Sequence, residues 1–286
     1  MSLSELLSHK EEILVMPGVY DALTAKIAEH VGFKAIFQTG YGTSASMLAM
    51  PDFGFLSMTE TLETARRITR AVNIPLIVDV DTGYGNPLTV WKLVNDLQEI
   101  GASGIFLEDQ VWPKRCGHMI GKEVISCDEY IPKLKSAIDA KKNNPDFIIV
   151  ARTDARAPLG IDEAIKRGKK YREVGADVVF VEAPHSVEEL AAISSEIKAP
   201  LVANMIEEGI TPNLTSKELL DLGYSIAVFP LSGLYSSTFA VYNTFKTLQQ
   251  TGTTKILTDK MIKFKEFNKL VELDKYMDME RKYINN

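Results

Sequence analysis

The chain has 286 residues, of which 45% are hydrophobic, so it can bury one large core. Its net charge of −6 at pH 7 gives phosphate backbones and anionic membranes no general electrostatic reason to bind. It lacks a signal-peptide pattern and any apolar run of roughly 18 residues, and two cysteines are too few for a disulfide framework, so we expect a soluble, cytoplasmic protein without nucleic-acid or membrane partners.

Eight short runs rich in Val, Ile and Phe alternate with helical patterns along the first 236 residues. Parallel strands joined by crossover helices have this layout, and nearly continuous apolar runs are typical of strands covered on both faces. The predicted strands are Ile13–Met16, Ala35–Gln38, Pro75–Val80, Gly104–Leu107, Phe147–Ala151, Val178–Val181, Leu201–Ala203 and Ile226–Phe229. Eight buried parallel strands predict an α/β fold, a (β/α)8 TIM barrel, for residues 1–236.

A weak internal repeat supports this prediction. A glycine stands three residues before four of the runs, at Gly32, Gly101, Gly175 and Gly223. Glycine readily adopts the left-handed conformation that ends a helix, so the repeat indicates that one kind of helix-to-strand joint is reused.

Helical patterns return in residues 237–286, at Phe239–Gln249 and then at Leu257–Tyr283. The second pattern is rich in Lys, Glu and Asp. We expect a C-terminal helical extension that belongs to the same domain and packs on the barrel or on a neighbouring subunit.

The positions directly after the predicted strands are unusually polar, and the carboxyl ends of the strands carry the active site in barrels of this kind. These positions include Thr39, Gly40, Tyr41, Asp79, Asp81, Glu108, Arg152, Glu182 and Asn204. Asp79 and Asp81 are two residues apart, so strand periodicity would point both carboxylates to one face. A hard cation such as Mg²⁺ would make the pair tolerable, with Glu108 as a third, water-mediated contact. The alternative is one inward and one surface aspartate.

Two further side chains stand out for their chemistry. Arg152 has the fixed fork that suits a carboxylate or a developing oxyanion, although an ion pair with Glu182 or Asp154 explains it equally well. Cys116 lies in the loop after the fourth strand, where Lys114, Arg115 and His118 would favour the thiolate and lower its pKa. We therefore expect Cys116 to pass a proton at neutral pH, with an inert loop cysteine as the alternative.

Several motifs together resemble the isocitrate lyase and phosphoenolpyruvate mutase superfamily over nearly the whole chain. The motifs are Pro51-Asp52-Phe53-Gly54, Val78-Asp79-Val80-Asp81, Glu108-Asp109-Gln110, Lys114-Arg115-Cys116-Gly117-His118, Ala151-Arg152-Thr153-Asp154-Ala155 and Asn204-Met205-Ile206-Glu207. The cysteine-bearing loop is similar to that of the lyase branch, which includes methylisocitrate lyases and 2,3-dimethylmalate (2-alkylmalate) lyases. The resemblance implies a TIM barrel, a homotetramer and cleavage of a 2-hydroxy dicarboxylate or tricarboxylate to pyruvate or another α-keto acid plus a carboxylic acid.

The resemblance also implies a role for each matched position. Magnesium, with manganese as a substitute, would be held by Asp79 and Asp81 with Glu108 in the outer shell. Cys116 would be the catalytic acid with His118 beside it, Arg152 would stabilise the reacting oxygens, and Tyr41 or Asp52 would be the initial base. The substrate-binding residues would be Thr39, Gly40, Tyr41, Gly117, Arg152, Glu182 and Asn204.

One departure from the family pattern concerns substrate choice. Methylisocitrate lyases carry an arginine shortly after the Pro-Leu-Ser segment and another in the C-terminal helices, where this chain has Tyr235 and Phe264. Two aromatic residues in these places favour an alkyl group over an extra carboxylate, and hence a 2-alkylmalate. The alternatives are an oxaloacetate hydrolase, a phosphonate mutase or hydrolase of the same fold, and a non-catalytic metabolite-binding protein.

Overall fold

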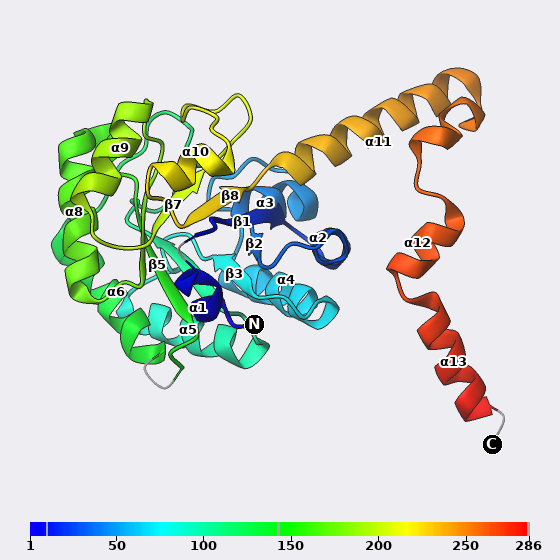
Figure 1. Cartoon of the computed structure of the whole chain (residues 1–286), viewed down its shortest axis with the longest axis horizontal. Coiled ribbons are helices and arrows are strands. Elements are labelled where there is room, and N and C mark those ends of the chain that lie inside the picture. The colour runs from blue at the N-terminus through cyan, green and yellow to red at the C-terminus, as the bar shows by residue number, and fades with distance from the viewer. Residues whose placement is uncertain (10, 142–143, 285–286) are drawn as a thin grey trace. The chain divides into compact units, whose positions relative to one another are not determined.

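In the computed structural model, which describes residues 1–9, 11–141 and 144–284, eight parallel strands close into a barrel in the order of the sequence (Figure 1). The strands are β1 (Leu14–Val19), β2 (Ile36–Gln38), β3 (Leu76–Asp79), β4 (Gly104–Glu108), β5 (Ile148–Thr153), β6 (Val178–Val181), β7 (Leu201–Asn204) and β8 (Ile226–Phe229). Strand β1 closes the barrel on β8, with Leu14 opposite Ile226 and Pro17 opposite Phe229. The predicted (β/α)8 barrel is confirmed.

The first strand differs most from its prediction, because it ends at Val19 rather than at Met16. The Pro17-Gly18 pair does not stop it, since Pro17 keeps its place in the register with β8. A Cβ atom at Gly18 would lie 2.2 Å from the carbonyl oxygen of Pro230, so glycine permits the close approach of the two chains there.

Helices surround the barrel and connect successive strands, except α1, which precedes β1 (Figure 1). They are α1 (Leu3–Ser8), α2 (Ala22–Val31), α3 (Gly40–Leu48), α4 (Met58–Ala71), α5 (Pro87–Ile100), α6 (Cys127–Lys141), α7 (Arg156–Leu159), α8 (Ile161–Val174), α9 (Val187–Glu196) and α10 (Ser216–Asp221). All four glycines of the repeat have positive φ, and Gly32 and Gly101 are the left-handed caps of α2 and α5. The predicted joint is confirmed.

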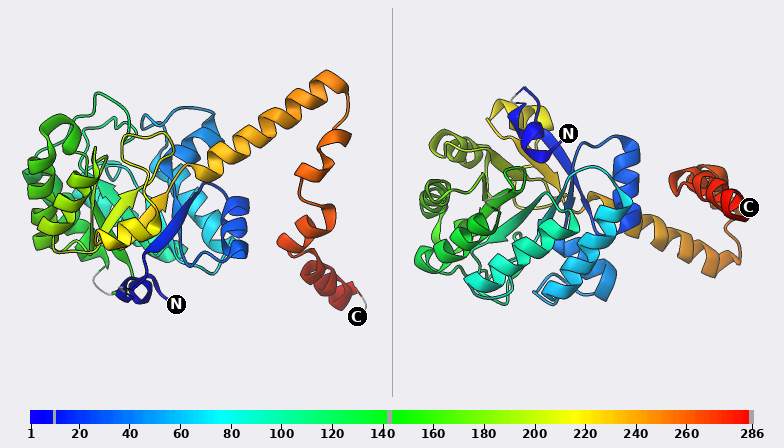
Figure 2. Two further views of the ribbon diagram at one scale, coloured as in Figure 1. Left: turned by 45° about the horizontal axis from the view of Figure 1, so that its top comes forward. Right: turned by 90° about the horizontal axis from the view of Figure 1, so that it is seen from below.

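The core has an inner and an outer part. Inside the barrel, Phe37, Phe106 and Phe180 pack against each other, with ring centroids 4.7 Å apart for the first pair and 5.7 Å for the second. Leu3 and Leu6 of α1 belong to the same interior cluster, and Figure 2 shows α1 in dark blue at the end where β1 begins. Outside the barrel, the apolar faces of helices such as α4 and α5 cover the strands.

The chain divides into two compact units, residues 1–232 and 233–286. The second unit contains most of α11 (Ser232–Thr251), then the 3₁₀ helix η1 (Lys255–Lys260), α12 (Phe264–Leu270) and α13 (Leu273–Ile284). The pattern read as Leu257–Tyr283 is therefore interrupted, because Met261 is extended and Glu272 has a φ of +56°. Residues 285 and 286 of the predicted extension lie outside the described residues.

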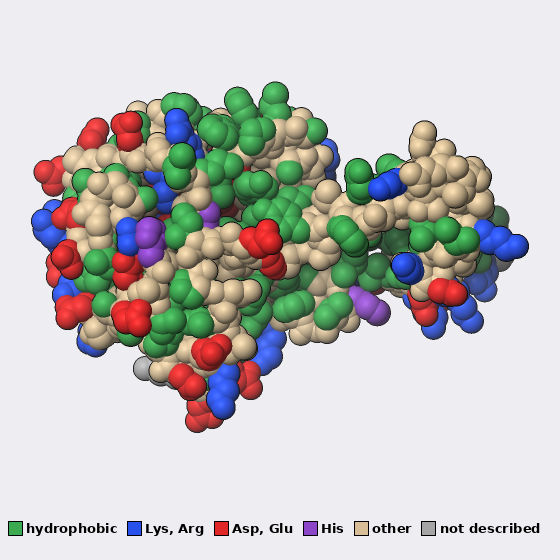
Figure 3. All heavy atoms as spheres, turned by 90° about the horizontal axis from the view of Figure 1, so that it is seen from above, with side chains coloured by type: hydrophobic (Ala, Val, Ile, Leu, Met, Phe, Trp, Pro, Cys, Tyr) green, Lys and Arg blue, Asp and Glu red, His purple; other side chains and the backbone are tan. Residues whose placement is uncertain are grey.

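Hydrophobic side chains reach the surface of the second unit (Figure 3). Phe239 is 72% exposed, Phe245 65% and Phe264 85%, while Leu270 is buried. Within the described ranges, no helix combines the length and apolar content needed to cross a membrane.

Candidate active site

A pocket with an empty volume of about 420 Å³ opens at the carboxyl ends of the strands. Eight of the predicted site residues line it, namely Thr39, Tyr41, Asp52, Asp79, Cys116, Gly117, Arg152 and Asn204. The remaining lining residues are apolar, namely Phe37, Phe106, Phe180, Ile206, Val228, Pro230 and Leu231. The pocket thus combines an apolar wall with a group of convergent polar side chains, as expected for a small-molecule site.

The N-terminus of α3 forms one side of this pocket. Thr39 caps the helix by accepting a hydrogen bond from the backbone N–H of Gly42. The N–H of Gly40 donates to Asp79 Oδ2 over 3.3 Å. First-turn N–H groups and the helix dipole favour an anion, so this helix end suits a substrate carboxylate.

Asp79 and Asp81 lie together, although not for the predicted reason. Strand β3 ends at Asp79, and Asp81 has a left-handed φ of +49°, so strand periodicity does not extend to it. A Cβ atom at Gly40 would nevertheless lie within 2.9 Å of Asp79 Oδ2 and 3.6 Å of Asp81 Oδ1. Burial, together with repulsion from Asp79 and Asp52, raises the pKa of Asp81 to about 7 despite the attraction of Lys114.

The ammonium group of Lys114 joins two of the site carboxylates. It lies 2.6 Å from an oxygen of Asp52 and 2.7 Å from Asp81 Oδ1, and its side chain is only 3% exposed. From the sequence we expected Lys114 to stabilise the Cys116 thiolate. In the structure its positive charge pairs with Asp52 and Asp81 instead.

The predicted lowering of the Cys116 pKa is therefore wrong. Loss of water around the half-buried thiol and repulsion from Asp52 raise the pKa of Cys116 to about 11, and Lys114 offsets this only in part. Cys116 carries a proton at neutral pH, which is the state a proton donor requires.

Arg152, at the end of β5, is surrounded by acidic side chains. Its Nε lies 2.8 Å from Asp154 Oδ2 and 3.2 Å from Glu108 Oε2, and its Nη2 lies 3.7 Å from Glu182 Oε2. The ion pairs weighed as the alternative are thus present, and the guanidinium also lines the pocket. Arg152 lies over the Phe180 ring at 5.3 Å, so the guanidinium also makes a cation–π contact at the pocket wall.

Glu182, His118 and Asn204 form a second polar group. Glu182 is fully buried, lies 3.1 Å from His118 Nε2 and accepts a hydrogen bond from Asn204 Nδ2. Burial alone would raise the pKa of Glu182, but Arg152 and His118 hold it below its usual range. His118 Nδ1 accepts from the N–H of Ile210, so this side chain joins the cysteine-bearing loop to the segment after β7.

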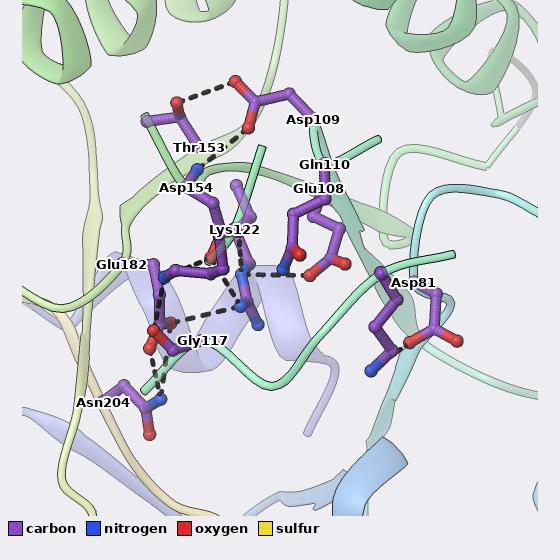
Figure 4. A network of polar contacts seen from close by, with 12 residues as sticks. Asp81, Glu108, Asp109, Gln110, Gly117, Lys122, Thr153, Asp154, Glu182 and Asn204 are labelled. Atoms are coloured by element: carbon purple, nitrogen blue, oxygen red, sulfur yellow. Dashed lines mark hydrogen bonds and ion pairs between the residues drawn. The ribbon is translucent and has the colours of Figure 1, made fainter. Parts of the chain in front are cut away.

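Two charged residues without a predicted role, Asp109 and Lys122, hold other side chains of the site in place (Figure 4). Asp109 accepts hydrogen bonds from Thr153 Oγ1, Tyr171 OH and the N–H of Asp154, and pairs with Arg167. Lys122 pairs with Asp154. A lysine fourteen residues beyond the end of β4 gives no sequence signal of burial, whereas the acidic pair Glu108-Asp109 could have drawn attention to Asp109.

Comparisons with known proteins show which proteins the chain resembles. The family model for phosphoenolpyruvate phosphomutase matches residues 3–247. The chain is 46% identical to 2,3-dimethylmalate lyase of Eubacterium barkeri, covering 98% of this chain and 96% of that protein. It is 48% identical to chloroplastic carboxyvinyl-carboxyphosphonate phosphorylmutase of Arabidopsis thaliana (98% and 83% covered) and 40% identical to 2-methylisocitrate lyase of Aeropyrum pernix (96% and 87%).

Three solved structures share the fold over nearly their whole length. Oxaloacetate acetylhydrolase in complex with 3,3-difluorooxalacetate has a TM-score of 0.93 at 35% identity, covering 99% of this chain and 96% of that one. The trigonal form of 2,3-dimethylmalate lyase has a TM-score of 0.92 at 31% identity, with 98% and 94% covered. Phosphonopyruvate hydrolase with oxalate and Mg²⁺ has a TM-score of 0.87 at 29% identity, with 99% and 100% covered.

Proposed function

The chain is a carbon–carbon lyase of the phosphoenolpyruvate mutase/isocitrate lyase superfamily, and from this membership and the pocket we propose that it depends on Mg²⁺ and cleaves a 2-alkylmalate. A 2-alkylmalate such as 2,3-dimethylmalate would yield an α-keto acid and a second carboxylic acid. The observation that carries the proposal is the composition of the pocket. Among the described residues that line it, seven are Phe, Ile, Leu, Val or Pro and the cationic one is Arg152. A substrate with alkyl groups gains from such a wall, whereas a third carboxylate would need a further cation.

The donor set fits a divalent cation that keeps water or substrate oxygens among its ligands. Asp79 and Asp81 offer hard carboxylate oxygens close together. Glu108 Oε1 is buried without a hydrogen-bond partner among the described residues. This oxygen could accept a hydrogen bond from a water molecule bound to the metal. Mg²⁺ is usually held by one or two carboxylates and completed by water or substrate oxygens, so two aspartates suit it. Mn²⁺ is the proposed substitute. When bound, the ion would polarise the substrate oxygens at C1 and C2.

Residues of the chain itself would carry out the remaining steps of the reaction. Thr39, Gly40 and Tyr41, at the start of α3, bind the α-keto-acid carboxylate, and Tyr41 or Asp52 takes the proton from the C2 hydroxyl. The C2–C3 bond then breaks, its electron pair passes to C3, and Arg152 stabilises the oxyanion that becomes the new carbonyl. The Cys116 thiol gives its proton to C3, which completes the carboxylic acid.

The direct test is a substrate panel at fixed protein concentration. It comprises 2,3-dimethylmalate, 2-methylisocitrate, isocitrate, oxaloacetate and phosphonopyruvate, each with Mg²⁺ and with EDTA. We expect α-keto-acid release from 2,3-dimethylmalate only with Mg²⁺. We expect kcat/KM to exceed that for 2-methylisocitrate by about tenfold or more, because a missing charge-assisted hydrogen bond costs ~1.5–3 kcal/mol.

Each other outcome identifies an alternative. Faster cleavage of 2-methylisocitrate would contradict the alkylmalate proposal, and full activity in EDTA would contradict the metal. Acetate release from oxaloacetate as the main reaction would indicate a hydrolase like the solved acetylhydrolase, whereas phosphonopyruvate turnover would indicate a phosphonate enzyme. Ligand-induced stabilisation without turnover would indicate a binding protein.

We further propose a cytoplasmic homotetramer in which the second unit contributes to contacts between copies. The apolar side chains of that unit support this, because exposed Phe239, Phe245 and Phe264 would gain from burial against another copy.

A further inference from the structure

Lys122 ends the loop of residues 114–122 that carries Cys116, and it is buried although lysine prefers water. Its Nζ lies 2.9 Å from Asp154 Oδ1, and the two side chains are 1% and 0% exposed. The same Nζ donates a hydrogen bond to the carbonyl oxygen of Gly117. A buried ammonium group requires such partners, because its desolvation is costly without them.

The bond to Gly117 fixes the middle of the loop. Gly117 lies between Cys116 and His118, and a Cβ atom there would lie 2.4 Å from Glu182 Oε1 and 2.6 Å from Arg152 Nη2. The loop backbone therefore rests directly on the two charged side chains. The loop has other anchors on either side of Gly117. Lys114 pairs with Asp52 and Asp81, and the N–H of Cys116 donates to the carbonyl of Asp52. His118 contacts Glu182 and accepts from the N–H of Ile210.

Asp154 connects this loop to the guanidinium of Arg152. It accepts from Arg152 Nε over 2.8 Å and from Nη2 over 3.0 Å, as well as pairing with Lys122. Its own backbone N–H donates to Asp109 Oδ1 over 2.9 Å, which anchors it to the barrel (Figure 4). One carboxylate thus orients Arg152 and holds the segment that bears the thiol.

We propose that Lys122 is a positioning residue that latches the Cys116 segment onto Asp154, so that the thiol and the Arg152 guanidinium keep a fixed relation across the pocket. Lys122 is not among the residues that line the pocket and acts through Gly117 and Asp154. The role of Cys116 in proton transfer rests on the proposed function, whereas the latch itself does not.

The test compares Lys122→Met with Lys122→Arg and with the control Lys141→Met in the full-length chain. Lys141 also forms a partly buried ion pair, with Asp177 near the start of β5, away from the pocket. Iodoacetamide labelling at pH 8 is followed separately at Cys116 and Cys127 by mass spectrometry, so that Cys127 is an internal reference.

In Lys122→Met we expect Cys116 to be labelled about tenfold faster or more while Cys127 is unchanged, because a released segment opens locally. On the substrate of the panel, kcat should fall more than KM rises, and Lys122→Arg should restore part of both effects. Lys141→Met should label like the wild type. Should Lys122→Met not fold, Lys122→Gln takes its place.

Unchanged labelling of Cys116, or equal acceleration at both cysteines, would overturn the latch, and faster labelling with an unchanged kcat would overturn the positioning role. If the wild type turns over no substrate of the panel but Cys116 is still released in Lys122→Met, the proposed function fails while the latch stands.

Discussion

At the scale of single residues, Cys116 shows that neighbours in the sequence do not fix the electrostatics of a side chain. Lys114 and Arg115 flank the thiol in the sequence, yet Lys114 contacts Asp52 and Asp81 and Arg115 donates to the carbonyl of Ile120. Burial and the negative charge of Asp52 therefore affect the pKa of the thiol more than the two cations do.

The neutral thiol gives a prediction for reactivity as a function of pH. With a pKa raised to about 11, Cys116 is on the order of 0.1% thiolate at pH 8, so its alkylation should be slow there and should accelerate up to about pH 11. Since the donor form persists, kcat should show no loss assignable to Cys116 below about pH 10. An alkylation midpoint near pH 8 at this residue would contradict the account.

Replacement of the thiol gives a prediction for turnover. Cys116→Ser should lower kcat by roughly 100- to 10,000-fold, the usual contribution of a general acid, because a hydroxyl is a much weaker acid. Substrate affinity, measured by calorimetry with Mg²⁺ present, should change little, because the loop backbone is held by Asp52 and Lys122 rather than by the sulfur. Cys127→Ser is the matched control and should retain wild-type kcat. A near-normal kcat in Cys116→Ser would remove this residue from the mechanism.

At the scale of elements, the loop of residues 114–122 is shaped by one glycine. Gly117→Ala would place a methyl group against Glu182 and Arg152, and relief requires the loop to move away from the pocket. We expect kcat/KM to fall by about 5- to 100-fold, since overpacking typically costs ~1–3 kcal/mol. The melting temperature should be nearly unchanged, because a loop can yield without disturbing the barrel.

Ile120→Ala, at an 89% exposed position of the same loop, is the control for that substitution and should behave like the wild type. An active Gly117→Ala enzyme would mean that the loop does not lie on Arg152 during turnover.

The same elements show how far sequence reasoning reaches. Strands were predicted well where burial on both faces leaves a continuous apolar run, as in β6 and β8, whose predicted bounds match the structure. The strand-end rule also identified five residues that line one pocket, namely Thr39, Tyr41, Asp79, Arg152 and Asn204. It worked because the barrel topology, rather than local sequence, places those residues together.

Interactions between distant segments explain what the sequence did not show. The left-handed turn at Asp81 and the burial of Lys122 depend on contacts made by other strands and loops. The breaks in the C-terminal helices at Met261 and Glu272 carry no glycine or proline, which are the residues that usually signal such ends.

At the scale of the whole molecule, the second unit gives a prediction for assembly. Light scattering after size exclusion should show a tetramer of the 31.8 kDa chain. Phe239→Glu combined with Phe245→Glu on α11 should shift it to smaller species, because charged residues are disfavoured in a buried interface core. Gln249→Glu, on the same helix, is the control for added charge. A monomeric wild type at micromolar concentration would contradict the homotetramer.

The three phenylalanines at the centre of the barrel have a consequence for how this protein can change. Phe37, Phe106 and Phe180 are the top of the interior core and at the same time the floor of the pocket. Truncating one of them to admit a bulkier substrate would leave a cavity in the barrel, which typically costs ~3–5 kcal/mol for Phe to Ala. A substitution at one of these positions therefore changes substrate range and thermal stability together.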